Sequence, residues 1–141
     1  MKILIINGPN INMLGKRESI YGDFDYKSII EYTERKCNEM KLSLDWWQSN
    51  SESEIIEKIQ TIEKKLYDGL IINPAAYSHT SIAILDALLT LKVPIVETHL
   101  TNVYNRETFR HSMLTAKASS IIMSGLGKDA YYFAALALIE K

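Results

Sequence analysis

Five short strand-like segments recur along this chain and constrain its fold more than any other feature: four are apolar runs with β-branched residues, and residues 42–48 alternate between apolar and polar side chains. They cover residues 2–7, 42–48, 69–72, 94–98 and 119–123, and polar or glycine-containing segments separate them. Runs of this length and composition are typical of strands that are buried on one or both faces of a sheet. The chain therefore predicts five largely buried strands.

Segments between the first three runs carry apolar residues at helical spacing. Over Asp25–Met40, apolar side chains repeat on one side of the expected helix and charged side chains lie on the other. A second helix is expected to begin near Ser51, because Ser51 and Glu54 fit a capping box. Its apolar positions continue as far as Leu66, which we expect to face inward.

The second half of the chain continues this alternation. A third helix is expected to begin at Ser78 or Thr80 and to run to about Leu91, a short helix to lie near 105–112, and a final helix to cover 130–139. Strands separated by helices indicate βαβ units with right-handed crossovers. We expect an α/β fold, a flavodoxin-like three-layer sandwich with a five-stranded parallel sheet, in a single domain of residues 1–141.

Charge balance and cysteine content exclude several classes of protein. Sixteen basic and seventeen acidic residues leave a net charge of −1, without the basic excess of a general nucleic-acid binder. One cysteine cannot form an internal disulfide, and with only three histidines a metal site is not expected. The first residues lack a signal-peptide cleavage site, and the longest uncharged stretch is too polar to span a membrane. We expect a cytoplasmic protein that binds neither nucleic acid nor membranes.

Two of the expected helices are apolar over most of their surface. Residues 82–91 and 131–139 present apolar side chains in most directions, whereas a helix that covers one sheet face needs only a stripe. Dense packing within the core is one explanation of this pattern. Contact between subunits is the other, and we expect a homo-oligomer.

Polar side chains follow the expected strands at their carboxyl ends, where open α/β sheets bind ligands. They are Asn7, Asn10, Asn12, Arg17, Tyr21, Asn73, Tyr77, Ser78, His79, His99, Thr101, Asn102, Arg106, Arg110 and His111. Because surface loops are polar in general, this clustering alone does not distinguish an active site from a solvated rim.

Two pairs within this rim point to chemistry. Glu97 and His99 are two residues apart on one strand, so their side chains share a face, and a carboxylate beside an imidazole suits a general acid. The plainer interpretation is a hydrogen-bonded histidine at a strand end. Arg106 and Arg110 lie four residues apart on the expected short helix and face either one anion or solvent. Dinucleotide, Walker and flavin-phosphate loops are lacking, so no cofactor is expected.

Five blocks of sequence, in this order and spacing, resemble type II 3-dehydroquinate dehydratase. They are Asn7–Glu18, Gln48–Asn50, Asn73–Ser81, Glu97–Asn102 and Arg106–Ser112. The resemblance implies a flavodoxin-like lyase of the shikimate pathway, in aromatic amino acid biosynthesis, that works without metal or cofactor. It also implies that 3-dehydroquinate is dehydrated to 3-dehydroshikimate by anti elimination through an enolate, in a homododecamer built from trimers.

Roles for the catalytic residues follow from the same resemblance. Tyr21 matches the base that removes the C2 proton, and Arg17, in the same loop, matches the residue that makes this phenol more acidic. Asn10 is similar to a residue beside the enolate oxygen and its ordered water. His99 matches the general acid that protonates the departing C1 hydroxyl, and Glu97 matches the residue that orients it.

A second set of residues resembles the family's substrate contacts. Asn73, His79 and Arg110 match contacts to the substrate carboxylate and hydroxyls. The backbone amides of Leu100 and Thr101 match groups that hold the carboxylate.

Two more positions lie at the edge of the implied site. Arg106 matches a second cation near the loop, and Asp86 resembles an acidic residue that reaches a neighbouring subunit's site. The segment from Arg17 to Tyr21 is one residue shorter than is usual in the family and lacks its proline. We expect this change to alter the distance between the two side chains and to lower turnover without changing the reaction.

A tyrosine base requires strong electrostatic help. A free tyrosine has a pKa of ~10, and lowering it by ~2–3 units takes ~3–4 kcal/mol. One guanidinium at ~4 Å supplies ~4 kcal/mol at an effective dielectric constant of ~20, before solvent screening. Arg17 alone is barely sufficient, so we expect a closed loop or Arg106 to help.

Other functions stay open at this point. One is a catalytically weak or silent relative that binds a cyclic polyhydroxy acid, and another is an enzyme acting on a different compound of that class. A flavodoxin-like signalling or redox module is more remote, since the phosphate loop and acidic pocket that such modules need are lacking.

Overall fold

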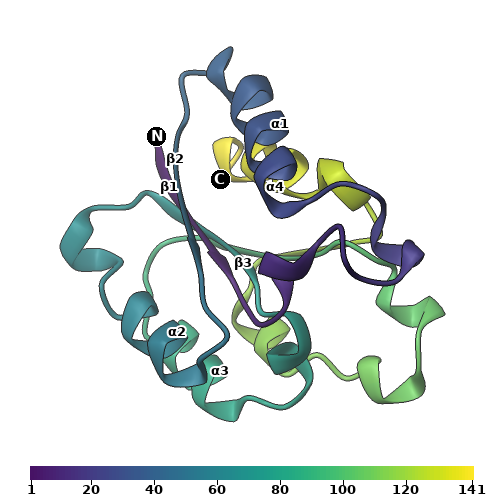
Figure 1. The fold of residues 1–141 in the computed structure, drawn as a ribbon. Helices are drawn as coiled ribbons and strands as arrows, with labels where there is room; N and C mark the ends of the chain where they lie inside the picture. The colour runs from purple at the N-terminus through teal and green to yellow at the C-terminus, as the bar shows by residue number, and fades with distance from the viewer.

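The computed structural model describes residues 1–141 and contains one five-stranded parallel sheet (Figure 1). Its strands are β1 (Lys2–Asn7), β2 (Ser43–Gln48), β3 (Gly69–Asn73), β4 (Ile95–His99) and β5 (Ile121–Ser124). The strand order is β2-β1-β3-β4-β5, which is the flavodoxin-like order. The predicted fold class is therefore confirmed, and each predicted strand is present.

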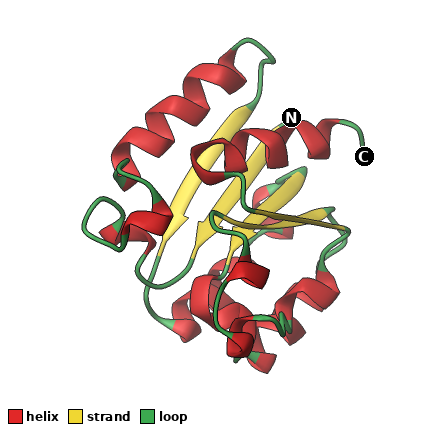
Figure 2. Cartoon of the chain, turned by 90° about the vertical axis from the view of Figure 1, so that its right-hand side faces the viewer, coloured by secondary structure: helices red, strands yellow, loops and turns green.

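Helices cover both faces of this sheet. α1 (Tyr26–Asn38) and α4 (Ala130–Ile139) pack on one face, and α2 (Glu52–Ile59) and α3 (Ile82–Leu89) pack on the other (Figures 1 and 2). None of these helices is both long enough and apolar enough to cross a lipid bilayer. The result is the predicted three-layer arrangement.

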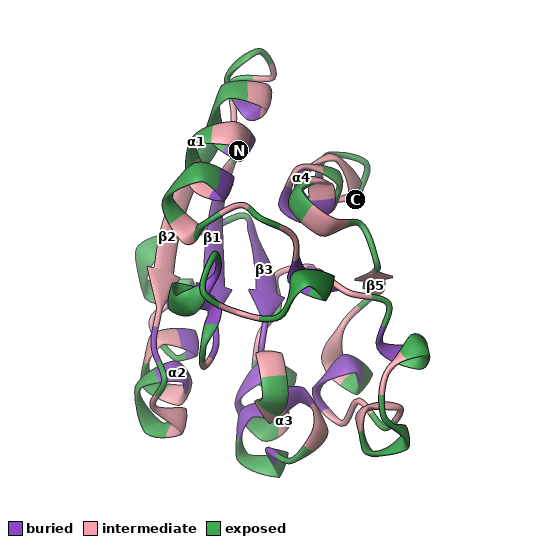
Figure 3. Cartoon of the chain, turned by 45° about the vertical axis from the view of Figure 1, so that its right-hand side comes forward, coloured by how far each residue is buried: buried purple, intermediate pink, exposed green.

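Alternation along the strands divides the apolar residues into two cores. On β1, Ile3 and Ile5 face α1 and α4, whereas Leu4 and Ile6 face α2 and α3. The two central strands β1 and β3 are buried on both faces, while β2 at the sheet edge is only half-buried (Figure 3). Burial on both faces explains why the central strands have uninterrupted apolar sequences.

Serine side chains cap the two helices on the α2–α3 face. Ser51 accepts a hydrogen bond from a backbone N–H of α2, as predicted. α3 is capped by Ser81, whose Oγ accepts the Ile84 N–H at 2.9 Å, so the prediction of Ser78 or Thr80 as the cap is wrong. Ser78 is instead fully buried beneath the carboxyl edge of the sheet.

Two predicted helices differ from the structure. α2 ends at Ile59, and the short 3-10 turn Glu63–Lys65 follows before β3 begins at Gly69. Leu66 adopts a left-handed backbone and is 81% exposed, so its inward assignment is wrong. In place of the short helix near 105–112 there are two 3-10 turns, Val103–Asn105 and Thr108–Arg110.

The two apolar helices have different surroundings. Five residues of α4 are buried within the chain itself: Ala130, Tyr131, Ala134, Ala135 and Leu138. Core packing therefore accounts for much of this helix. On α3, Ile82 and Leu89 are 63% and 60% exposed, so packing within the chain does not account for that face.

Candidate active site

A polar pocket opens at the carboxyl ends of β1, β3 and β4, at the edge where open α/β sheets bind ligands. Its volume of about 610 Å³, which includes space open to solvent, lies within the ~300–1,000 Å³ range of small-molecule sites. The polar lining consists of Asn10, Arg17, Tyr21, Asn73, His79, His99, Thr101, Arg106 and Arg110. The lining contains three arginines and no carboxylate, which favours an anionic ligand.

A loop between two buried side chains, Leu14 and Tyr21, forms one wall of the pocket. Glycines with positive φ lie at its two ends, Gly15 at 90° and Gly22 at 87°. A Cβ at Gly22 would also lie 2.5 Å from the Phe24 ring, so conformation and space both require glycine. The loop turns sharply at both ends and directs the Tyr21 ring into the pocket wall.

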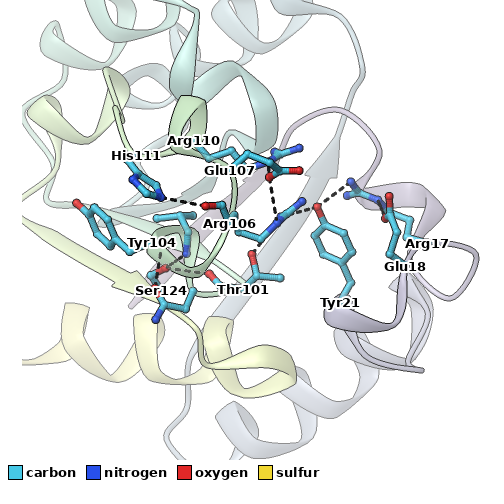
Figure 4. A network of polar contacts seen from close by, with 12 residues as sticks. Arg17, Glu18, Tyr21, Thr101, Tyr104, Arg106, Glu107, Arg110, His111 and Ser124 are labelled. Atoms are coloured by element: carbon cyan, nitrogen blue, oxygen red, sulfur yellow. Dashed lines mark hydrogen bonds and ion pairs between the residues drawn. The ribbon is translucent and has the colours of Figure 1, made fainter.

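Two guanidinium groups contact the phenol oxygen of Tyr21 (Figure 4). Arg17 Nη2 donates to this oxygen at 3.0 Å and Arg106 Nη1 donates at 2.8 Å. Both guanidiniums also lie against the ring, 3.9 Å and 5.1 Å from its centroid. The shortened loop therefore keeps Arg17 beside Tyr21. Two cationic donors on one oxygen stabilise negative charge there.

Arg106 is anchored along its whole length (Figure 4). Its backbone carbonyl accepts a hydrogen bond from His111 Nε2 at 3.1 Å, and its Nη1 lies 3.4 Å from Thr101 Oγ1. Glu107 pairs with Arg106 Nε at 3.7 Å and with Arg110 Nε at 2.8 Å. A backbone N–H and the Arg110 guanidinium hold the pKa of the Glu107 carboxyl below its usual value. Both arginines line the pocket, although they do not share a helix as predicted.

The Glu97–His99 pair lies deeper, at the end of β4. His99 Nε2 donates to Glu97 Oε1 at 2.8 Å, and the two residues are 5% and 0% exposed. Ser78 Oγ donates to the same carboxylate oxygen at 2.7 Å, and Thr115 Oγ1 donates to the other oxygen at 2.8 Å. Glu97 is thus a buried carboxylate with hydrogen bonds to both oxygens. Since Nε2 of His99 is committed to Glu97, Nδ1 is the nitrogen left for a ligand.

His79 lies beside His99, with ring centroids 6.3 Å apart in a stacked arrangement. Its Nδ1 donates to the Ser112 carbonyl at 2.9 Å. Burial lowers the pKa of His79, opposed by the Ser112 hydrogen bond, and the nearby charges of His99 and Arg110 lower it further. A neutral His79 with a proton on Nδ1 presents Nε2 as a hydrogen-bond acceptor.

Two asparagines line the pocket from the ends of β1 and β3. Asn10 has a left-handed backbone, with φ of 69°, and its N–H donates to Asn50 Oδ1 at 3.1 Å. Asn73 is 2% exposed, its Oδ1 accepts the Ala75 N–H at 3.1 Å, and its Nδ2 donates to the Tyr131 hydroxyl at 3.2 Å. The Asn73 side chain is therefore held by groups outside the pocket, whereas Asn10 is held through its backbone N–H.

Two of the predicted site residues do not line the pocket. Glu97 contacts it only through His99, and Asp86 lies exposed on α3, outside the pocket of its own chain. The other residues to which the family resemblance gave a role, including Leu100 and Thr101, line it. The remaining polar residues of the rim do not line it: Asn7, Asn12, Tyr77, Ser78, Asn102 and His111. No three His, Cys, Asp or Glu side chains come together as metal ligands.

Several supporting residues were not found by sequence reasoning. Thr115 begins the 3-10 turn Thr115–Ala118, in a segment whose sequence has no pattern that would mark it, and Ser78 was predicted only as a rim residue or helix cap. The Gln48–Asn50 block is one of the five that resemble the family, but no role in the site was predicted for it. In the structure, Gln48 Nε2 donates to the Gly8 carbonyl at 3.1 Å and to Asn50 Oδ1 at 3.0 Å, which ties the segment after β1 to the end of β2.

Fold and pocket together define a flavodoxin-like α/β enzyme with a basic site that holds a tyrosine and a histidine. Comparison with known families shows which family of such enzymes the chain resembles. A family model described as "Dehydroquinase class II" matches residues 1–139. The chain belongs to the class II dehydroquinase family.

Individual relatives agree with this assignment. A protein from Clostridium perfringens strain SM101, named 3-dehydroquinate dehydratase, is 49% identical over 139 residues, which are 98% of this chain and 95% of the relative. The crystal structure of a type II dehydroquinase from Butyrivibrio crossotus superposes with a TM-score of 0.96 at 40% identity, covering 99% of this chain and 97% of the other. That of the type II dehydroquinase from Propionibacterium acnes gives a TM-score of 0.92 at 34% identity, with coverages of 99% and 97%.

Proposed function

We propose that this enzyme dehydrates 3-dehydroquinate to 3-dehydroshikimate by anti elimination through an enolate, as a cytoplasmic step of the shikimate pathway. The observation that carries the proposal is the phenol oxygen of Tyr21, which receives hydrogen bonds from two guanidiniums in a pocket shared with His99. A substrate that carries a carboxylate suits a lining with three arginines and no acidic side chain.

Tyr21 is the base in the first step. As a phenolate it takes the proton from C2, and the electron pair of the C–H bond becomes the enolate. Arg17 and Arg106 both contact the phenol oxygen, at 3.0 Å and 2.8 Å. Two charge-assisted hydrogen bonds to one oxygen stabilise a phenolate more than the single guanidinium of Arg17 would.

Asn10 acts while the negative charge is on the enolate oxygen. The hydrogen bond from its backbone N–H to Asn50 fixes its left-handed backbone, from which the side-chain amide extends at the pocket lining. Preorganised donors stabilise a developing oxyanion without a cost in reorganisation during the reaction. Because the amide of Asn10 stabilises the enolate without a charge, Arg17 and Arg106 can stay hydrogen-bonded to Tyr21.

His99 is the acid in the second step. It gives a proton to the C1 hydroxyl, which leaves as water while the enolate electrons form the new double bond. Glu97 fixes the ring through Nε2, so the proton leaves from Nδ1. Afterwards solvent takes the proton from Tyr21 and returns one to His99, which restores the enzyme.

The remaining polar groups bind the substrate. Arg110, His79 and Asn73 contact its carboxylate and hydroxyls, and the backbone amides of Leu100 and Thr101 hold the carboxylate. All five residues line the same pocket.

A homododecamer built from trimers is part of the proposal. Ile82 and Leu89 form an exposed apolar face on α3, and the exposed Asp86 lies between them in the sequence. Burial of this face against another subunit would take Asp86 towards that subunit's site.

An absorbance assay tests the function directly. With 3-dehydroquinate as substrate, formation of the conjugated enone of 3-dehydroshikimate gives a rising ultraviolet signal. Turnover by the purified chain supports the proposal. Absence of signal at high enzyme concentration would favour the weak or silent relative instead.

A further inference from the structure

A buried polar chain lies beneath the pocket, and Asn73 is its one member with a role in the proposed function. Asn7 and Asn73, the last residues of β1 and β3, lie side by side in register, and the Tyr131 hydroxyl of α4 contacts both side chains. Exposure is 0% for Asn7, 2% for Asn73 and 0% for Tyr131. Each buried donor or acceptor of this kind needs a hydrogen-bond partner, because one left without a partner in the core costs free energy.

The direction of every hydrogen bond in this chain follows from one backbone donor. The Ala75 N–H can only donate, so its partner on Asn73 is Oδ1 and the Nδ2 group must point towards Tyr131. Tyr131 accepts from that Nδ2, and its own proton goes to Asn7 Oδ1. Asn7 Nδ2 is then the group that donates to Tyr26, at 3.3 Å.

A hydroxyl is well suited to the middle of this chain. It accepts one hydrogen bond and donates another at the same time, which neither an amide nitrogen nor a carbonyl oxygen can do. Burial raises the pKa of Tyr131, so its hydroxyl keeps its proton over the working range of the enzyme.

We infer that Tyr131 is a positioning residue, whose hydroxyl holds the Asn73 amide so that an N–H group, and not the carbonyl, faces the pocket. The inference deepens the proposed function and rests on it for the identity of the ligand. With Oδ1 held by Ala75 and one Nδ2 proton held by Tyr131, the second Nδ2 proton is left for a ligand. Asn73 therefore selects an oxygen with free lone pairs, such as a substrate hydroxyl or carboxylate.

Tyr26 offers a matched control. Its hydroxyl belongs to the same polar chain but contacts Asn7 and not Asn73. Both tyrosines also pack against Trp46, with ring centroids 6.4 Å and 5.0 Å from it. Tyr131→Phe and Tyr26→Phe each remove one phenol oxygen and keep the ring, so they differ in whether the lost oxygen touches Asn73.

The experiment compares both variants of the full chain with the wild type by two measurements. One is the position and hydrogen exchange of the Asn73 side-chain N–H signals in a ¹⁵N–¹H spectrum, and the other is the KM and kcat for 3-dehydroquinate. We expect Tyr131→Phe to shift these signals, speed their exchange and raise KM by about 5- to 10-fold, as befits one buried hydrogen bond, with a smaller change in kcat. Tyr26→Phe leaves KM within about twofold.

A double variant tests the route of the effect. If Tyr131 acts through Asn73, adding Tyr131→Phe to Asn73→Ala raises KM no further than Asn73→Ala alone. Full additivity, or Asn73 signals that move no more in Tyr131→Phe than in Tyr26→Phe, would overturn the inference. Equal losses of thermal stability in both variants with unchanged KM would do so as well. A wild type without turnover refutes the proposed function, whereas the Asn73 signals still decide whether Tyr131 holds the amide.

Discussion

Two neighbouring parts of one pocket stabilise charge in opposite ways. Around Tyr21, two guanidiniums from separate loops contact one phenol oxygen, and one of those loops lies between two glycines on the surface. Around Glu97, a carboxylate with no exposed surface receives hydrogen bonds from two hydroxyls and one imidazole. Charge on the loop side, around Tyr21, is stabilised by two guanidiniums, whereas charge on the strand side, around Glu97, is stabilised by hydroxyl and imidazole donors within the core.

The physical reason lies in desolvation. A carboxylate without solvent costs several kcal/mol unless its lone pairs are satisfied, and a lone buried cation would bring a comparable cost of its own. Ser78 and Thr115 avoid that second cost because they are neutral. On the phenol side the arginine side chains keep 20% and 12% of their surface exposed, and their guanidiniums lie against the Tyr21 ring. Substitutions on the loop side should therefore affect turnover, and those on the strand side should also affect stability.

The largest effect is expected from Tyr21→Phe. Removing the phenol oxygen removes the proposed base, and kcat should fall by about 10³-fold or more, since general-base groups contribute ~10²–10⁴-fold. The dissociation constant for substrate, measured by calorimetry on the inactive variant, should change little. A variant that keeps more than about a tenth of wild-type kcat would refute the assignment of Tyr21.

His99→Ala should separate the two steps of the reaction. We expect product formation to fall by about 10²-fold, because the leaving hydroxyl loses its acid. Exchange of the C2 hydrogen with deuterated solvent, followed by NMR, should fall less, since Tyr21 and its arginines are untouched. An equal fall in both rates would count against His99 as the acid.

Arg17→Met tests the loop side with the phenol still present. One of two cationic donors is lost, and we expect kcat to fall by about 10-fold or more with little change in the urea midpoint of unfolding. Glu18→Gln is the matched control, because Glu18 lies 3.9 Å from Arg17 Nε and is largely exposed. A large loss of stability in Arg17→Met would contradict the separation between turnover and stability on this side.

Thr115→Val tests the strand side with a nearly isosteric side chain. It leaves one oxygen of a fully buried carboxylate without its donor, and we expect a loss of about 1–3 kcal/mol in the free energy of unfolding. Urea unfolding of Thr115→Val and of Thr101→Val, a pocket hydroxyl that does not contact Glu97, gives the comparison. Equal stability of the two variants would show that Glu97 does not need this hydroxyl.

The smallest effect concerns pH. The pKa of His79 is lowered in the folded chain, mainly by burial, so the unfolded chain takes up this proton first as the pH falls. Stability therefore decreases on acidification through ~6.5, the usual pKa of histidine, until folded His79 also becomes protonated. His79→Gln should flatten the dependence of the urea midpoint on pH below ~6.5. An unchanged slope would contradict burial of a neutral His79.

Much of the framework was predictable because it depends on local pattern. Alternating apolar runs and amphipathic segments report strand and helix periods directly, and the five strands were found with small shifts at their ends. Errors occurred where the chain reverses, as at Leu66 and near residue 108, because turns depend on where the next strand must begin. The family resemblance predicted most of the pocket residues, because the motifs that carry it come directly after the strands in the sequence.

Long-range contacts explain the rest. Arg106 meets Tyr21 across 85 residues, Thr115 meets Glu97 across 18, and Tyr131 meets Asn7 across 124. Periodicity and spacing describe neighbours along the chain and say nothing about which loops converge above a sheet. Composition and pattern thus define an α/β sandwich with a polar rim. The paired cations on one phenol, the hydroxyls on a buried carboxylate and the tyrosine behind Asn73 exist only after the sheet has brought distant segments within hydrogen-bonding distance.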